Sequence, residues 1–233
     1  AYRGMLDDRY DTRYNLHGKN FDLFIDSQNE GEGLVDSIAS LASYSSFLKL
    51  VYNSIEYFGI EKIQSGIEPS IICIDGLLTQ DNFDVKNEWE DVCKLYPGNA
   101  IYHVRWESKS IKDFKKTWLK WGILFPQPVA VVGSLLTNWF DACENAELTG
   151  VLLAKIIKKT TKEYILIGHS LGARVIHSCL SSLEPGGRTF IKDVHLLGGA
   201  VDNHESSKTK WREAYKVISG KIHNYHSKHD TVL

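Results

Sequence analysis

Apolar residues along this chain gather in short runs, each followed by a stretch in which they recur at three- and four-residue steps. The runs at 71–74, 100–106 and 164–167 are typical of strands, and the continuous apolar run at 71–74 suits a strand buried on both faces. Helical spacing follows them, most regularly over 81–95 and 171–183. Further strands are predicted at 193–201 and 222–226, and further helices at 141–159 and 208–219. Strands that alternate with helices predict an α/β fold, with a mostly parallel sheet and helices on both faces.

The N-terminal part of the chain has a different pattern. Residues 1–31 are polar and aromatic, and only Phe21–Ile25 is spaced as a strand would be. From 32 to 63 apolar residues form a stripe at helical steps, which indicates a packing face, either against the domain or against a protein partner. We therefore predict a leader and helical segment at 1–66, and an α/β domain at 67–233.

The segment 107–140 combines lysines with a long uncharged stretch. Residues 107–120 are spaced as a basic amphipathic helix. The twenty residues that follow, 121–140, carry no charge and have the length of a membrane span. Pro126 and Pro128 argue against a regular spanning helix. Three interpretations remain: a buried connection, a lid or acyl-pocket wall, and a membrane-inserted segment. The adjacent lysines would suit peripheral contact with an anionic membrane.

The sharpest chemical signal is the pentapeptide Gly168-His169-Ser170-Leu171-Gly172. A predicted strand precedes it and a predicted amphipathic helix follows it, which is the context of a nucleophile elbow. In such an elbow, small residues let neighbouring backbones approach while the serine hydroxyl projects from the end of the sheet. The alternative is a glycine-bounded turn with a helix-capping serine. That alternative does not explain why glycines flank the serine on both sides.

Several polar or small residues follow the ends of the predicted strands. They are Gly76, Ser170, Asp202 and Asp230. The ligand crevice of a parallel sheet lies at the carboxyl ends of its strands, so these residues are expected to converge there. Their convergence predicts a candidate active site built around Ser170.

The composition indicates which class of protein this is, but it does not identify a reaction. The 233 residues are 43% hydrophobic and 24% charged, as in soluble globular proteins, and the net charge of -2 offers nucleic acid no general attraction. The four cysteines have neither the pairing nor the spacing of a zinc site, which favours reduced thiols in a cytoplasmic setting. No metal or cofactor is expected. The charged N-terminus lacks the features of a secretory signal.

The chain resembles the α/β-hydrolase superfamily and, more closely, the family of transmembrane and coiled-coil domain-containing proteins. The resemblance begins near residue 71 and rests most specifically on GHSLGARVI at 168–176 and KVISGKI at 216–222. It implies a serine-dependent esterase or lipase. Several members of that family carry membrane spans before the hydrolase part, whereas 32–63 is too polar to be one. The resemblance thus allows a cytoplasmic protein with membrane association.

The resemblance also implies roles for individual residues. In an α/β-hydrolase the oxyanion is held by two backbone N–H groups, which here would belong to Leu77 and Leu171. Asp230 matches the usual position of the acid, and Asp202 is the fallback. The usual chain order is serine, acid, histidine, but no histidine follows Asp230.

The sequence therefore leaves open which histidine completes the set of serine, acid and histidine. We expect it beyond Leu233. With Asp202 as the acid, His226 or His229 would be the candidate base. His169 inside the elbow and His177 on the following helix are expected to point away from the serine hydroxyl.

Two functions are consistent with this pattern. The first is a serine hydrolase that cleaves an acyl ester, which could be that of a membrane lipid, through an acyl-enzyme on Ser170. The second is a non-catalytic α/β-hydrolase-like module that binds a lipid or a partner protein through 32–63 and 107–140.

Overall fold

The computed structural model describes eight strands and four named helices. The described residues are 14–16, 19–25, 57–77, 79, 84–106, 108, 127–186, 190–201 and 211–227. The strands are β1 (Tyr14–Leu16), β2 (Lys19–Ile25), β3 (Tyr57–Gln64), β4 (Ile67–Ile74), β5 (Asn99–Trp106), β6 (Tyr164–His169), β7 (Ile191–Leu197) and β8 (Ile222–Tyr225). The helices are α3 (Val85–Glu88), α4 (Glu90–Leu95), α6 (Gln127–Lys159) and α7 (Leu171–Ser182).

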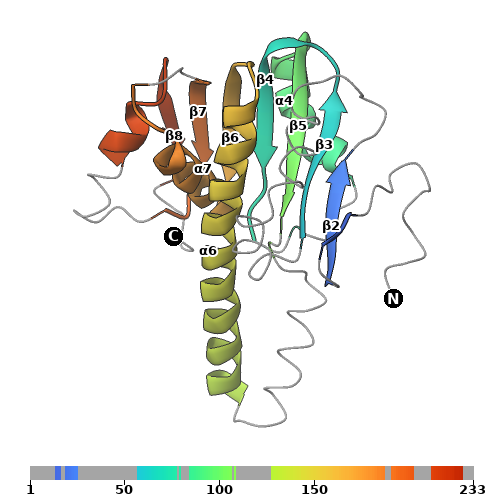
Figure 1. Ribbon diagram of the computed structural model, residues 1–233. Coiled ribbons are helices and arrows are strands. Elements are labelled where there is room, and N and C mark those ends of the chain that lie inside the picture. The colour runs from blue at the N-terminus through green and yellow to red at the C-terminus, as the bar shows by residue number, and fades with distance from the viewer. Residues whose placement is uncertain are drawn as a thin grey trace.

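The strands form one mixed sheet in the order β1-β2-β3-β5-β4-β6-β7-β8. The run from β5 through β4, β6 and β7 to β8 is parallel throughout, while β3 pairs antiparallel with β5. This arrangement confirms the predicted α/β fold with a mostly parallel sheet (Figure 1).

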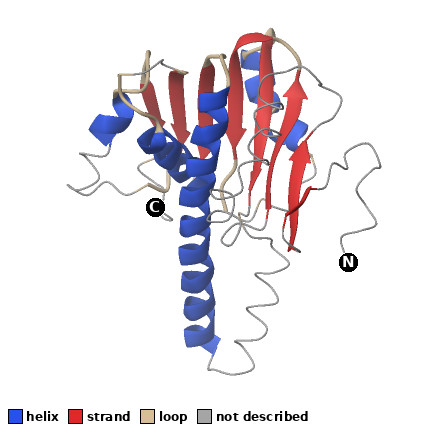
Figure 2. Ribbon diagram, viewed as in Figure 1, coloured by secondary structure: helices blue, strands red, loops and turns tan. Residues whose placement is uncertain are grey.

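Helices cover both faces of this sheet, as Figure 2 shows. Successive side chains of a strand point to opposite faces, and β4 divides accordingly. Ile72 and Ile74 join the large core cluster with residues of α6 and α7. Ile71 and Cys73 join a smaller cluster with Val85 and Trp89, beside α3 and α4. All four β4 side chains are buried, which explains the uninterrupted apolar run at 71–74.

α6 is a single helix of 33 residues and begins earlier than the sequence predicts. The predicted start at residue 141 is wrong. Pro128 is the second residue of the helix, where the missing N–H has no intrahelical acceptor in any case. The N-terminal half of α6 extends past the carboxyl ends of β4 and β6 (Figure 1). Within the described part of the chain, no helix has both the length and the hydropathy that a membrane span requires.

The helix predicted over 32–63 is wrong at its end, because residues from Tyr57 onward form β3. Phe58 and Ile60 alternate into the large core cluster and pair with Trp106 and Val104 of β5. The rest of that predicted helix lies outside the described residues, as does the basic helix at 107–120 apart from Ser108. The domain boundary at residue 66 stays a prediction.

Other local predictions agree with the structure. The strand expected at Phe21–Ile25 is part of β2. The helix expected over 81–95 is present as α3 and α4, which Trp89 separates, and Asp84 caps α3 by accepting from the Asn87 N–H. Of the helix expected at 208–219, the described part is helical over 211–215.

Candidate active site

Ser170 lies in a sharp turn between the last residue of β6 and the first residue of α7. Its φ of 51° and ψ of -116° make it the one non-glycine residue with positive φ in the described parts of the chain. Three backbone hydrogen bonds hold this conformation. The Ser170 N–H donates to the Leu197 carbonyl at 2.9 Å, and the Ser170 carbonyl accepts from Ala173 at 3.1 Å and Ala200 at 3.0 Å.

The Ser170 side chain does not cap α7, because it makes no capping hydrogen bond. This excludes the alternative of a glycine-bounded turn with a helix-capping serine. The residue is partly exposed. A strained backbone whose serine hydroxyl does not cap the following helix is the geometry expected of a nucleophile elbow.

The two flanking glycines are required by close packing. A Cβ on Gly172 would lie 2.2 Å from the Ile74 carbonyl oxygen. A Cβ on Gly168 would lie 2.7 Å from the backbone of Gly172. Because both contacts involve backbone atoms, no side chain fits at either position without moving the first turn of α7 away from the end of β4.

A third glycine brings the loop after β4 against the serine. A Cβ on Gly76 would lie 2.8 Å from the Ser170 Cβ and 3.3 Å from its Oγ. β4 is the neighbour of β6, with Ile74 paired to Gly168, and β5 lies on the other side of β4. The strand order therefore reverses between β4 and β6, which is where parallel sheets place their ligands.

Two backbone amides belong to the segments that meet at Ser170. Leu171 is the first residue of α7, and its N–H belongs to the first turn, which has no intrahelical acceptor. Leu77 directly follows Gly76, and its side chain packs against the large core cluster. The N-terminus of a helix favours negative charge. The turn between β6 and α7 is therefore suited to an anion that develops beside the Ser170 Oγ.

The sequence analysis missed a buried ionisable pair at the base of this loop. Asp75 and His103 are 2% and 5% exposed, and Asp75 Oδ2 lies 2.8 Å from His103 Nε2. Trp106 Nε1 donates to the main-chain carbonyl of Asp75 at 3.1 Å. The signal in the sequence was a histidine in the middle of the predicted strand at 100–106 and an aspartate at the end of the predicted strand at 71–74.

Most of the predicted acids and bases lie outside the described residues. This holds for Asp202, Asp230 and His229. His226 is described and exposed, directly after β8. Strand register links His169 of β6 to Leu197 of β7, and Leu197 to Tyr225 of β8. His226 therefore follows β8 at the level at which Ser170 follows β6, with the two backbones about 10 Å apart across two strand spacings.

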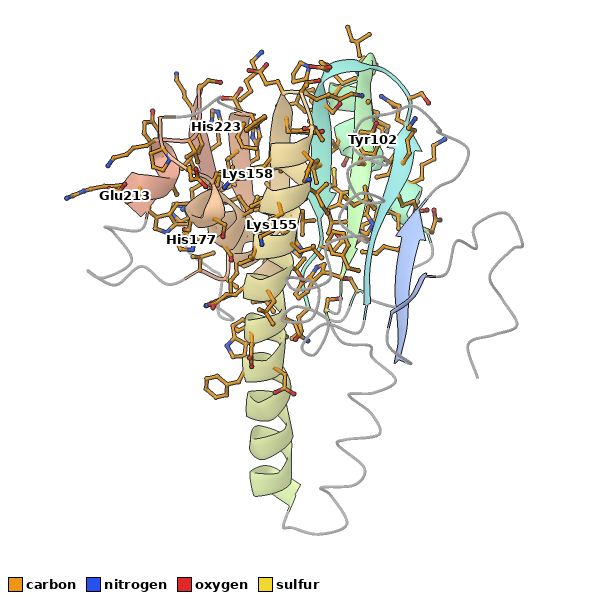
Figure 3. The ribbon with its side chains drawn as sticks, in the orientation of Figure 1. Tyr102, Lys155, Lys158, His177, Glu213 and His223 are labelled. Atoms are coloured by element: carbon orange, nitrogen blue, oxygen red, sulfur yellow. The ribbon has the colours of Figure 1, made fainter. Side chains whose placement is uncertain are left out.

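Two histidines, His169 and His177, are predicted from the sequence to point away from the Ser170 hydroxyl. His169 is exposed at the end of β6. His177, on the outward side of α7, packs its ring against Trp211 with the centroids 4.6 Å apart (Figure 3).

Two further histidines lie next to each other on the face of the sheet that α3 and α4 cover. His195 of β7 stacks on its register partner His223 of β8, with ring centroids 4.7 Å apart (Figure 3). His195 Nδ1 lies 3.2 Å from the Tyr225 hydroxyl. Burial, and then the neighbouring His223, lower the pKa of His195 below its ordinary value of 6.5. The sequence pattern does not reveal this cluster, because strand pairing creates it.

The four cysteines are free. Burial raises the pKa of the Cys73 and Cys179 thiols well above the usual value, so both remain protonated at neutral pH. In the described parts of the chain, no cluster of three histidine, cysteine or carboxylate side chains has the arrangement of a metal site.

Comparison with known proteins places this chain in a family. Residues 116–233 match the family model described as "Protein of unknown function (DUF726)". The chain belongs to the DUF726 family. The match covers the turn at Ser170, β7 and β8, so the strained serine lies within the segment that matches the family model.

Three relatives show the range of the family. An "Uncharacterized membrane protein" of Schizosaccharomyces pombe is 33% identical over 120 residues, 49% of this chain and 14% of that protein. An "Uncharacterized membrane protein" of Caenorhabditis elegans is 32% identical over 117 residues, 48% of this chain and 18% of that protein. The rice "Transmembrane and coiled-coil domain-containing protein STS1" is 31% identical over 102 residues, 42% of this chain and 15% of that protein. Its name is that of the family which the sequence resembles. The chain spans at most a third of the length of these curated relatives.

Proposed function

We propose that this DUF726 domain is a serine hydrolase of the α/β-hydrolase type, which cleaves an acyl ester through an acyl-enzyme on Ser170. The observation that carries the proposal is the strained backbone of Ser170 at the β6–α7 turn, with Gly76 of the neighbouring loop against its Oγ. The position of the serine after β6, and of the glycine loop after adjacent β4, supports the α/β-hydrolase assignment.

In this proposal the Ser170 Oγ attacks the ester carbonyl carbon and the ester oxygen leaves as an alcohol. The carbonyl oxygen becomes negatively charged in the tetrahedral intermediate, and the N–H groups of Leu171 and Leu77 stabilise it. Water then attacks the acyl-enzyme and releases the acid. Amides held rigidly at a site of developing charge are among the largest contributions to catalysis, because they need no reorganisation during the reaction.

The Ser170 hydroxyl must lose its proton to a base that a carboxylate orients. We propose Asp230 as that carboxylate and Asp202 as the alternative. With Asp230 as the acid, we expect the base beyond Leu233. With Asp202 as the acid, His226 is the first candidate base, since it follows β8 at the level at which Ser170 follows β6, and His229 is the second. Replacing the true base or the true acid should lower the rate by about 10²-fold or more, whereas replacing the other candidates should have little effect.

We further propose that the ester belongs to a membrane lipid. Two relatives are named membrane proteins, which supports a substrate at a membrane surface. The uncharged residues 127–140 belong to the half of α6 that extends past the carboxyl edge of the sheet, the edge at which β6 leads into Ser170 (Figure 1). Hydrolysis of lipid esters in vesicles at a higher rate than that of soluble short-chain esters would support this choice, and the reverse preference would contradict it.

A fluorophosphonate probe tests the catalytic proposal, because it forms a stable adduct with an activated serine. The full-length gene product should be labelled, its Ser170→Ala variant should not, and Ser181→Ala on the exposed side of α7 should be labelled like the wild type. Absence of labelling in the wild type, or labelling that persists in Ser170→Ala, would favour the non-catalytic binding module instead.

A further inference from the structure

The buried Asp75–His103 pair contacts the loop that packs against Ser170. His103 is the register partner of Cys73, and Asp75 follows Cys73 by two residues, so all three side chains lie on the α3–α4 side of the sheet. The surroundings are apolar and include Ile71 and Ile101. Burying two ionisable groups in such a place adds little stability compared with well-packed apolar side chains. The pair therefore calls for an explanation other than stability.

The contacts of Asp75 provide that explanation. Its carboxylate receives a hydrogen bond from His103, which points to one face of β5, while its carbonyl accepts from Trp106, which belongs to the core on the other face. β5 thus holds one residue of the loop from both sides of the sheet. That residue immediately precedes Gly76.

The next part of the loop is fastened to the end of β5 as well. The Thr79 hydroxyl donates to the Gly76 carbonyl at 2.8 Å. The Thr79 hydroxyl also lies 3.1 Å from that of Ser108, which is 1% exposed. The peptide units on both sides of Gly76 are therefore each held through a carbonyl oxygen. The N–H of Leu77 belongs to the second of these units, so its direction is determined by these contacts.

We propose that Asp75 and His103 are positioning residues, which hold the loop at Gly76 and Leu77 so that the Leu77 N–H faces the oxyanion formed at Ser170. The catalytic part of this inference rests on the proposed hydrolase function, whereas the holding of the loop does not. The pair has no direct contact with the reacting atoms in this assignment. Its effect passes through the backbone.

Two variants of the full-length protein separate positioning from stability. The double variant Asp75→Ala/His103→Leu removes both polar groups together, so no buried charge is left unpaired. His103→Gln keeps an N–H donor for Asp75. Thr149→Val is the matched control, because Thr149 is a fully buried polar residue of α6 whose hydroxyl has no hydrogen-bond partner among the described residues.

Two measurements are made on each variant: amide hydrogen exchange of the peptide that covers 75–79, and the rate constant of fluorophosphonate labelling. In the double variant, exchange should be about ten-fold faster and labelling about ten-fold slower, as the loss of a buried hydrogen bond implies. His103→Gln should restore both to within about three-fold of the wild type. Thr149→Val should match the wild type in both.

A folded double variant with wild-type exchange and wild-type labelling would overturn the inference. If the wild type itself is not labelled, the hydrolase proposal fails, and the exchange measurement alone still decides whether the pair holds the loop. If the double variant does not fold, Trp106→Phe replaces it, since this change removes only the indole donor to the Asp75 carbonyl. Faster exchange at 75–79 would then support the inference, and unchanged exchange would overturn it.

Discussion

At the scale of single residues, the backbone of Ser170 is strained, and this lowers stability while it fixes the position of the serine side chain. A side-chain-bearing residue at positive φ costs about 1–3 kcal/mol relative to a relaxed backbone. The three hydrogen bonds of the Ser170 backbone to Leu197, Ala173 and Ala200 keep it in that conformation. Glycine adopts positive φ without this cost.

Ser170→Gly should therefore raise the free energy of unfolding by about 1 kcal/mol relative to Ser170→Ala, although both variants lose the proposed nucleophile. Chemical denaturation of the two variants measures the difference. Ser181→Gly, in the helical backbone on the exposed side of α7, should instead destabilise relative to Ser181→Ala. Equal stabilities of the two variants at 170 would mean that the elbow is not strained.

Gly76 and Gly98 form a matched pair for the close approach to the serine. A Cβ at Gly76 meets Ser170, whereas a Cβ at Gly98 meets nothing within 4 Å. Gly76→Ala should slow fluorophosphonate labelling by about 10²-fold, as a displacement of the reacting groups by about 1 Å does. Gly98→Ala should leave labelling unchanged. Similar labelling of both variants would show that the loop has room to move.

At the scale of elements, the contact between α6 and α7 holds the helix that follows the serine. Gly150 of α6 lies against the backbone of α7, where an added Cβ would be 2.4 Å from the Val175 carbonyl oxygen. Nearby, the Ser178 hydroxyl donates to the Glu147 carbonyl at 2.6 Å, and Arg174 pairs with the Glu147 carboxylate at 3.0 Å. These contacts hold residues 174–178 of α7 against α6.

Gly150→Ala tests this contact through the sign of its effect. In an exposed helix the change would stabilise by about 1 kcal/mol. Here we expect destabilisation of about 1–3 kcal/mol, because the methyl group forces the two helices apart. Glu144→Ala on the exposed side of α6 is the control and should stay within about 0.5 kcal/mol of the wild type. A stabilised Gly150→Ala variant would contradict the packing.

The β7–β8 pair predicts a pH dependence of stability. The folded state lowers the pKa of His195 from 6.5, so the unfolded chain binds the proton more tightly there. The contribution of His195 is fully present above pH 6.5 and is lost as the pH falls through 6.5 towards the folded pKa. The facing groups are His223, Asp193 and Tyr225, of which the Asp193 charge opposes the shift.

Denaturation midpoints between pH 5 and pH 8 measure this dependence. The loss of stability on acidification should be smaller in His195→Phe than in the wild type, since phenylalanine keeps the stacking and cannot bind a proton. An identical dependence in both proteins would assign the effect to other groups.

At the scale of the whole molecule, the order of strands and helices from residue 67 onward follows from local pattern. Runs such as 71–74 are buried on both faces, and the pentapeptide at Ser170 has a strict backbone requirement that its glycines meet. Local pattern fails at β3, because its pairing with β5 overrides a spacing that also fits a helix. It also fails at the start of α6, which begins at Gln127 and not at the predicted residue 141, because Pro128 is tolerated in the first turn of a helix.

The candidate site is predictable where it is local and unpredictable where it is assembled over distance. The serine and both of its glycines lie within five residues. The Asp75–His103 pair joins residues 28 apart, and the stacking of His195 on His223 depends on the register of two strands. Neither pairing leaves a periodic trace in the sequence.

The central claim is that Ser170 becomes acylated. The most direct measurement is to mix the full-length protein with an activated acyl ester, quench in acid within seconds, and locate the added mass by peptide mass spectrometry. We predict one acyl group on the peptide that contains Ser170, and none in Ser170→Ala. An acyl group on another residue, or a wild-type protein that carries none, would contradict the account.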